Sequence, residues 1–141
     1  MTRLQDSSRI DPATQYALDV TDGRIVAGPY VRAAAARHLD DLQHGSDRGL
    51  YWDPEAAQRF FDFCSELLTL GEGQFAGVPF KLHPMQEFLA GSIFGWKRAD
   101  GTRRFRRAYI EQGKGNGKSP FAGALGLYGL IADGEAGAQI Y

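Results

Sequence analysis

The chain has 141 residues, of which 43% are hydrophobic and 23% are charged, and its formal net charge is −1 at pH 7. This length fits one domain with a real core, and the composition excludes wholesale disorder and a fibrous repeat. A net charge so close to zero gives no global attraction to nucleic acid or to an anionic membrane, so any such contact must rest on a local cluster.

Neither the cysteine nor the histidines predict a disulfide or a metal site. Cys64 is the single cysteine and falls in an apolar helical pattern, which fits a core position and a reducing compartment. His38, His44 and His83 share no ligand spacing, so a zinc site is not expected and structural roles are predicted for all three.

The N-terminal residues 1–15 lack the apolar run of a secretory signal, and no run in the chain approaches a bilayer-spanning length. We therefore expect a cytoplasmic protein. Residues 1–15 are also polar and aperiodic, which predicts a flexible arm. The YALDV segment at 16–20 is expected to form a short strand.

Three segments with helical periodicity follow. The first helix is predicted over residues 31–43. The second begins at Asp53, because an Asp cap followed by Pro54 is a strong start signal, and Gly71 is expected to end it. The third has Pro84 in its first turn. Their apolar faces consist of Val31, Ala34, Ala35, Leu39 and Leu42; of Ala57, Phe60, Phe61, Cys64, Leu67 and Leu68; and of Met85, Phe88, Leu89, Ile93 and Trp96.

The C-terminal part of the chain has the order strand, glycine-rich loop, helix, strand. RRFRRAYIEQ at 103–112 combines aromatic and β-branched residues, FAGALGLYGLIAD at 121–133 is apolar enough for a buried helix, and AQIY at 138–141 resembles the opening of a strand. We therefore predict an α/β fold in which a helical region at 16–100 leads into a truncated core at 101–141. Its parallel sheet would be interrupted in the second strand.

The chemically informative segment is GKGNGKS at 113–119. Glycines at 113, 115 and 117 allow the backbone to curl with positive φ, so that successive N–H groups point inward, and the following helix directs its positive dipole end to the same place. Lys118 would meet the β and γ phosphates of a nucleotide, and the Ser119 hydroxyl would ligate Mg²⁺.

This loop departs from the general phosphate-loop pattern. G-x-x-x-x-G-K-[ST] expects glycine at the position of Gln112, whereas the first glycine here comes one residue later. A bare G-K-[ST] arises by chance in roughly one chain in ten of this length. A glycine-rich structural turn is therefore the alternative, although the strand predicted before the loop and the helix predicted after it favour nucleotide binding.

Residues 103–141 resemble the start of the ATPase domain in large terminase subunits of tailed bacteriophages. YWDPEAAQRFFDFCSELL at 51–68 and GVPFKLHPMQEFLAGSIFGWKR at 77–98 resemble the segment that precedes it, and the resemblance is nearly continuous over 16–141. In this family the early glycine is relaxed and a basic residue stands four positions before the loop lysine. Lys114 has that position relative to Lys118. The resemblance therefore accounts for the presence of Gln112 where the general pattern expects glycine.

The resemblance implies an ATP-binding P-loop fold with a defined set of site residues. Lys118 and Lys114 would be the catalytic cations, and Ser119 would be the Mg²⁺ ligand. Gln86, in LHPMQEF, would read the adenine, because a side-chain amide offers a donor and an acceptor to the N6 and N7 edge. The alternative for Gln86 is an exposed helix glutamine. The remaining cofactor-binding residues would be Gly113, Gly115, Asn116 and Gly117.

The resemblance also implies a biological role. A full-length relative would use ATP to package double-stranded phage DNA into a capsid and would cut that DNA through a separate nuclease domain. Its partners would be the portal protein and the small terminase subunit, it would form a homo-oligomer, and it would work in the cytoplasm of the infected bacterium. No hydrophobic strand ending in acidic residues follows the loop, so we expect this fragment to be inactive by itself.

Two other functional classes fit the residues. One is a different P-loop NTPase, helicase-like or kinase-like. The other is a non-catalytic fragment that binds DNA or a partner through a basic cluster, because phosphate binding needs closely spaced cations. That cluster could equally be a solvated hairpin whose arginines pair with acids. It consists of Lys97, Arg98, Arg103, Arg104, Arg106 and Arg107, and is broken by Asp100.

Overall fold

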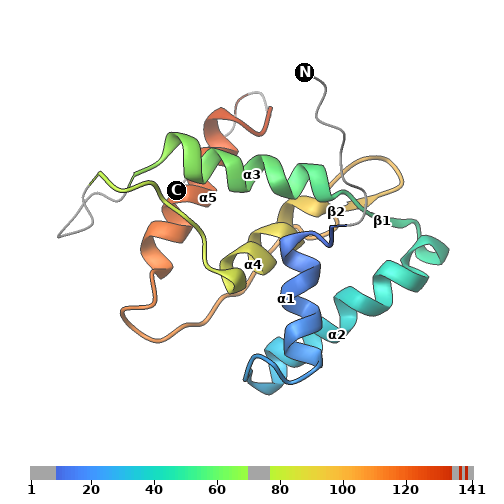
Figure 1. Cartoon of the computed structure of the whole chain (residues 1–141). Coiled ribbons are helices and arrows are strands. Elements are labelled where there is room, and N and C mark those ends of the chain that lie inside the picture. The colour runs from blue at the N-terminus through green and yellow to red at the C-terminus, as the bar shows by residue number, and fades with distance from the viewer. Residues whose placement is uncertain (1–8, 70–76, 135–136, 138, 140–141) are drawn as a thin grey trace.

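The computed structural model describes residues 9–69, 77–134, 137 and 139. Within these residues the chain is mainly helical. Helix α4 lies at the centre, where it contacts α1 and α3, while α1 also packs on α2 and α3 also packs on α5 (Figure 1). In chain order the elements are α1 (Pro12–Thr21), α2 (Pro29–His44), the 3-10 turn η1 (Gly45–Arg48), β1 (Leu50–Trp52), α3 (Pro54–Leu67), α4 (Pro84–Gly95), β2 (Trp96–Arg98) and α5 (Lys118–Ile131).

The helix starts follow from proline and aspartate chemistry. Helices α1 to α4 each begin with a proline, whose missing N–H has no partner to lose in the first turn. Asp53 accepts a hydrogen bond from the Ala56 N–H at 3.0 Å, which confirms the predicted start of α3. Asp11 caps α1 in the same way, through the Thr14 N–H at 3.0 Å.

The strand predicted at 16–20 is wrong, because these residues belong to α1. The Asp11–Pro12 pair gives the same start signal as Asp53–Pro54, and the buried residues that follow it recur at helical spacing. Residues 12–15 of the predicted arm also lie in this helix, and residues 1–8 lie outside the described residues. The buried face of α1 consists of Ala13, Tyr16, Ala17 and Val20, with Thr14 beside it.

The predicted helices α2, α3 and α4 are confirmed, with changes to their buried faces. Leu42 is 39% exposed in α2, where His38 and Asp41 are buried instead. In α3, Leu67 is 71% exposed and Phe63 is buried. The helix ends at Leu67, while the predicted terminator Gly71 lies outside the described residues.

The sheet has two antiparallel strands, in which Leu50 pairs with Arg98 and Trp52 with Trp96. The strand predicted at 103–112 is absent apart from an isolated bridge between Lys97 and Arg103. A strand needs a neighbour to satisfy its backbone groups, and the described part of the chain offers residues 104–112 none beyond β2. The parallel sheet predicted for 101–141 is therefore not formed among the described residues, and the strand expected at 138–141 falls almost entirely outside them.

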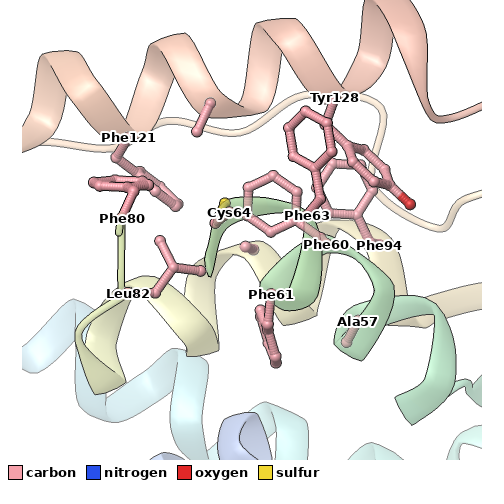
Figure 2. Packing of buried hydrophobic residues seen from close by; sticks show 12 residues of the cluster. Ala57, Phe60, Phe61, Phe63, Cys64, Phe80, Leu82, Phe94, Phe121 and Tyr128 are labelled. Carbon is pink, nitrogen blue, oxygen red and sulfur yellow. The ribbon is translucent and has the colours of Figure 1, made fainter. Parts of the chain in front are cut away.

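Helix α5 is tied to the rest of the fold through an aromatic core. Figure 2 shows Tyr128 directed from α5 toward Phe60 of α3 and Phe94 of α4. The Tyr128 ring lies 5.2 Å from that of Phe60 and 4.9 Å from that of Phe94, both edge-on. Phe121, 1% exposed, fixes the first turns of the same helix. The start of α5 is thus held against the molecule by its own buried face.

The predicted core position of Cys64 is confirmed, and Trp96 is also buried, although it lies in β2 and not in the predicted third helix. None of the helices in the described part of the chain is long and apolar enough to cross a membrane.

Candidate phosphate-binding loop

Residues 113–117 form a turn that ends at the first residue of α5. Gly115 has φ +88° and Gly117 has φ +72°, conformations that L side chains rarely adopt. The predicted curl with positive φ is therefore confirmed at these two glycines. Gly113 does not share it, but a Cβ added there would lie 3.3 Å from Asn116 Nδ2, so a side chain at 113 would crowd the turn.

The N-terminus of α5 leaves backbone donors without helical partners. Gly117 is the N-cap and supplies no side-chain cap, and the first intrahelical bond runs from the Phe121 N–H to the Gly117 carbonyl at 3.2 Å. The amides of Lys118 and Ser119 precede that bond, so no carbonyl of an earlier turn reaches them. Pro120 is the third residue of the helix and has no N–H to leave unpaired. Such a helix start attracts anions.

The polar side chains of the loop are exposed. Lys114, Asn116, Lys118 and Ser119 all face solvent, and no carboxylate in the described part of the chain lies within ion-pair distance of either lysine. Both ammonium groups are therefore available to an incoming anion. The arrangement places two cations and the orphan amides of one helix start on the same short stretch of backbone.

Gln86 reaches this loop from α4 although it lies far away in the sequence. Its side chain is 3% exposed, and its Oε1 accepts a hydrogen bond from the His83 N–H at 3.0 Å. Its Nε2 lies 3.5 Å from the position that a Cβ on Gly117 would take. The exposed helix glutamine considered as an alternative is therefore excluded, and the structure brings Gln86 close to the 113–119 loop.

Gln112, the residue at which the loop departs from the general pattern, is half-buried beside the start of α4. Its Nε2 lies 3.7 Å from the Met85 Sδ, a weak acceptor, while its Oε1 is buried with no hydrogen-bond partner. From the sequence, Gln112 was predicted only to replace a glycine, and its buried acceptor was not identified. A polar side chain at the end of an apolar segment was the one sequence feature that could have indicated a buried polar group here.

A hollow of about 330 Å³ lies at the helix start. It is lined by apolar residues such as Ile110 and Phe121 and also by Lys118 and Ser119. This hollow does not provide the oxygen ligands that Mg²⁺ prefers beyond the Ser119 hydroxyl. Among the residues that the structure describes there is also no group of three or more His, Cys, Asp and Glu able to hold a metal ion.

The basic cluster divides into paired and unpaired arginines. Arg103 forms an ion pair with Asp133, and Arg104 forms one with the buried Asp41. These two arginines fit the solvated-hairpin alternative. Arg106 and Arg107 are exposed and form no ion pair with any carboxylate of the described residues. DNA contact by the cluster stays a prediction.

Comparison with known families identifies the segment that contains this loop. Residues 84–141, from the start of α4 to the end of the chain, match the family model described as terminase large subunit, ATPase domain. The match includes Gln86 as well as the whole 113–119 loop. No curated protein and no solved structure matched the chain.

Proposed function

Because residues 84–141 match the terminase large subunit ATPase domain family, we propose that the chain binds ATP with Mg²⁺ at the 113–119 loop. The observation that carries this proposal is the left-handed N-cap at Gly117, which starts α5 at Lys118 with backbone amides that precede its first intrahelical hydrogen bond. A triphosphate tail is the ligand that such a helix start and two flanking lysines suit best.

Each loop residue has a defined task in this proposal. The Lys118 ammonium lies on the β and γ phosphates, and Lys114 adds a second cation on the outside of the turn. The Ser119 hydroxyl ligates Mg²⁺, which neutralises phosphate charge when it is bound. The backbone of Gly113, Gly115, Asn116 and Gly117 follows the phosphate chain. Gln86 faces the same loop and contacts the adenine edge.

The wider role is proposed from the same family match. The protein would act in a motor that packages double-stranded phage DNA into a capsid, as a homo-oligomer with a portal protein and a small terminase subunit, in the cytoplasm of the infected host. Nuclease cutting would belong to a separate domain. Residues 104–112 would become the first strand of a parallel P-loop sheet. Two exposed apolar side chains, Tyr109 of this segment at 88% and Ile131 at the end of α5 at 68%, support the packing of a further element on this part of the chain.

The experiment that tests ATP binding is titration of the chain with a fluorescent ATP analogue in the presence of Mg²⁺. Lys118→Ala should weaken binding by roughly ten- to a hundredfold, the value of one charge-assisted hydrogen bond. Lys97→Ala removes a lysine from β2, away from the loop, and should leave affinity unchanged. Equal affinity of Lys118→Ala and the unchanged chain would remove the phosphate-loop assignment.

One specific observation favours the non-catalytic alternative: Arg106 and Arg107 are exposed and form no ion pair with a carboxylate of the described residues. A chain that binds duplex DNA but no ATP analogue would support it. The other alternative, a helicase-like or kinase-like NTPase, shares the phosphate loop and would give the same Lys118 result. Binding to the partner proteins of a packaging motor separates that alternative from the terminase role.

A further inference from the structure

An open pocket of about 660 Å³ lies away from the phosphate loop, at the corner where η1 meets β1. Its other wall is the turn that follows β2. The pocket shares no lining residue with the 113–119 loop or with Gln86. Three arginines line it, Arg48, Arg98 and Arg104, together with Gly49, Leu50, Ala99, Asp100 and Phe105.

The carboxylates near these arginines do not balance them. Arg48 and Arg104 both donate to Asp41, whose side chain is 1% exposed, so one buried charge serves two cations. Asp100 is occupied by Thr102, whose N–H and hydroxyl donate to its Oδ1 at 2.9 Å and 2.6 Å. Arg98 forms no ion pair with the carboxylates of the described residues, although Asp100 lies near enough to interact with it electrostatically.

A fourth cation adds to the excess. The Arg37 guanidinium stacks on the Phe105 ring, 5.0 Å from its centroid, and the Arg104 guanidinium lies 4.8 Å from the same centroid. Burial, and then the charge of Arg104, lower the pKa of Arg37. The Arg37 and Arg104 guanidinium groups therefore repel one another, and an added anion would relieve that repulsion.

We propose that this pocket is a second phosphate-binding site, independent of the loop at 113–119. Guanidinium groups suit phosphate because each presents a planar fork of donors to two oxygens, and a phosphate offers enough oxygens for more than one fork. The ligand is a phosphate group, carried either by a nucleic-acid backbone or by free inorganic phosphate. Arg106 and Arg107, which follow Phe105 in the chain, are exposed and form no ion pair with a carboxylate of the described residues.

Ala99 provides a test that leaves the arginines in place. It is exposed and lines the pocket, so Ala99→Glu adds a carboxylate at the site without removing a packed group. Ala99→Gln adds a side chain of the same shape with no charge and is the matched control. Binding of a fluorescently labelled DNA duplex is measured by anisotropy over a salt series, and binding of inorganic phosphate by the thermal shift relative to chloride at equal ionic strength.

We expect Ala99→Glu to weaken binding about tenfold, while Ala99→Gln and the unchanged chain bind alike. Arg98→Gln should weaken binding in the same direction, whereas Arg24→Gln, which neutralises an exposed arginine bound to Asp19 and Asp22, should not. An effect in the DNA arm identifies a nucleic-acid backbone as the source, and an effect in the phosphate arm alone identifies free phosphate. No binding in either arm, or equal binding by Ala99→Glu and Ala99→Gln, overturns the proposal.

The outcome is separable from that of the ATP-binding proposal. Lys118→Ala leaves the pocket intact, so duplex or phosphate binding should persist in this variant. Ala99→Glu should keep the affinity of the unchanged chain for the ATP analogue. If Ala99→Glu and Lys118→Ala each abolish the same binding event, the two sites are one and the proposal of a second site fails.

Discussion

The side-chain nitrogen of Gln86 lies 3.5 Å from the position that a Cβ on Gly117 would occupy. This contact joins the first turn of α4 to the N-cap of α5. The Gln86 Oε1 is held by the His83 N–H, so the amide is oriented with its donor side toward the loop. Gln86 and Phe88 in the first turns of α4 are buried, so Gln86 holds a fixed position beside the exposed loop.

Gly117→Ala should destabilise the chain because the backbone there has φ +72°. An L residue in the left-handed region costs about 1–2 kcal/mol, and a Cβ at 3.5 Å from Gln86 is only an ordinary contact, so backbone strain dominates. Gly123→Ala is the control, since it lies within α5 with open space around it and should stabilise the helix by about 0.5–1 kcal/mol. Urea unfolding of both variants measures the difference. Equal stability changes would show that Gly117 is free to leave its conformation.

Gln86→Glu tests the role of the Gln86 amide nitrogen separately from that of its oxygen. The carboxylate retains an oxygen for the His83 N–H, so the start of α4 should persist. The donor toward Gly117 becomes an acceptor, which should reduce affinity for an ATP analogue roughly tenfold and diminish any preference of ATP over GTP. Gln58→Glu, on the exposed face of α3, is the control. Unchanged nucleotide preference in Gln86→Glu would limit Gln86 to a capping role.

Gln112→Met should stabilise the chain in the absence of ligand. The Gln112 Oε1 is buried with no hydrogen-bond partner, and an unsatisfied buried acceptor costs about 1–3 kcal/mol. Methionine has a similar length, lacks that acceptor and can pack against Met85. The expected gain is about 1 kcal/mol in urea unfolding, whereas Gln58→Met on the surface should change little. A loss of stability in Gln112→Met would mean that its contact with Met85 outweighs the orphan oxygen.

The sequence predicted local structure better than it predicted pairing. The Asp53–Pro54 start and the positive φ of Gly115 and Gly117 follow from the chemistry of single residues, and the structure contains them. The strand expected at 103–112 depended on a neighbouring strand, and residue types alone do not show whether a neighbour is present. The strand wrongly predicted at 16–20 could have been recognised as a helix from the local sequence, because Asp11–Pro12 carries the same capping signal as Asp53–Pro54.

The candidate site was predictable in its loop and not in its surroundings. The order of glycine, lysine and serine predicted the positive-φ turn at the start of α5. The approach of Gln86 to this turn depends on how α4 packs, and only the family resemblance linked Gln86 to the loop. The buried Gln112 oxygen and the pairing of Arg104 with Asp41 depend on tertiary contacts between distant segments, which periodicity does not report.

His38 joins α2 to the two-stranded sheet through a chain of hydrogen bonds that requires a neutral imidazole. Its side chain is 2% exposed, and its Nδ1 accepts from the Trp96 indole N–H at 3.0 Å. The proton therefore resides on Nε2, which donates to the Thr14 hydroxyl at 2.9 Å. The Thr14 hydroxyl in turn donates to Asp11 at 2.7 Å, and the Trp52 indole donates to the same carboxylate oxygen. Protonation of Nδ1 would break the bond to Trp96.

This network predicts that stability falls with acid in a defined window. Burial lowers the pKa of His38 from 6.5 to about 4, against the opposing charge of Asp11 and with the help of Arg104 and Arg37. Between these values the unfolded chain binds a proton that the folded chain does not, so the free energy of unfolding decreases as pH falls from 6.5 toward 4. The decrease should reach at most about 3 kcal/mol.

Urea unfolding at a series of pH values measures this decrease. His38→Gln, which keeps an uncharged donor and acceptor, should flatten the profile, whereas His44→Gln, at an exposed position, should not. A His38→Gln profile as steep as that of the unchanged chain would assign the acid sensitivity to other groups.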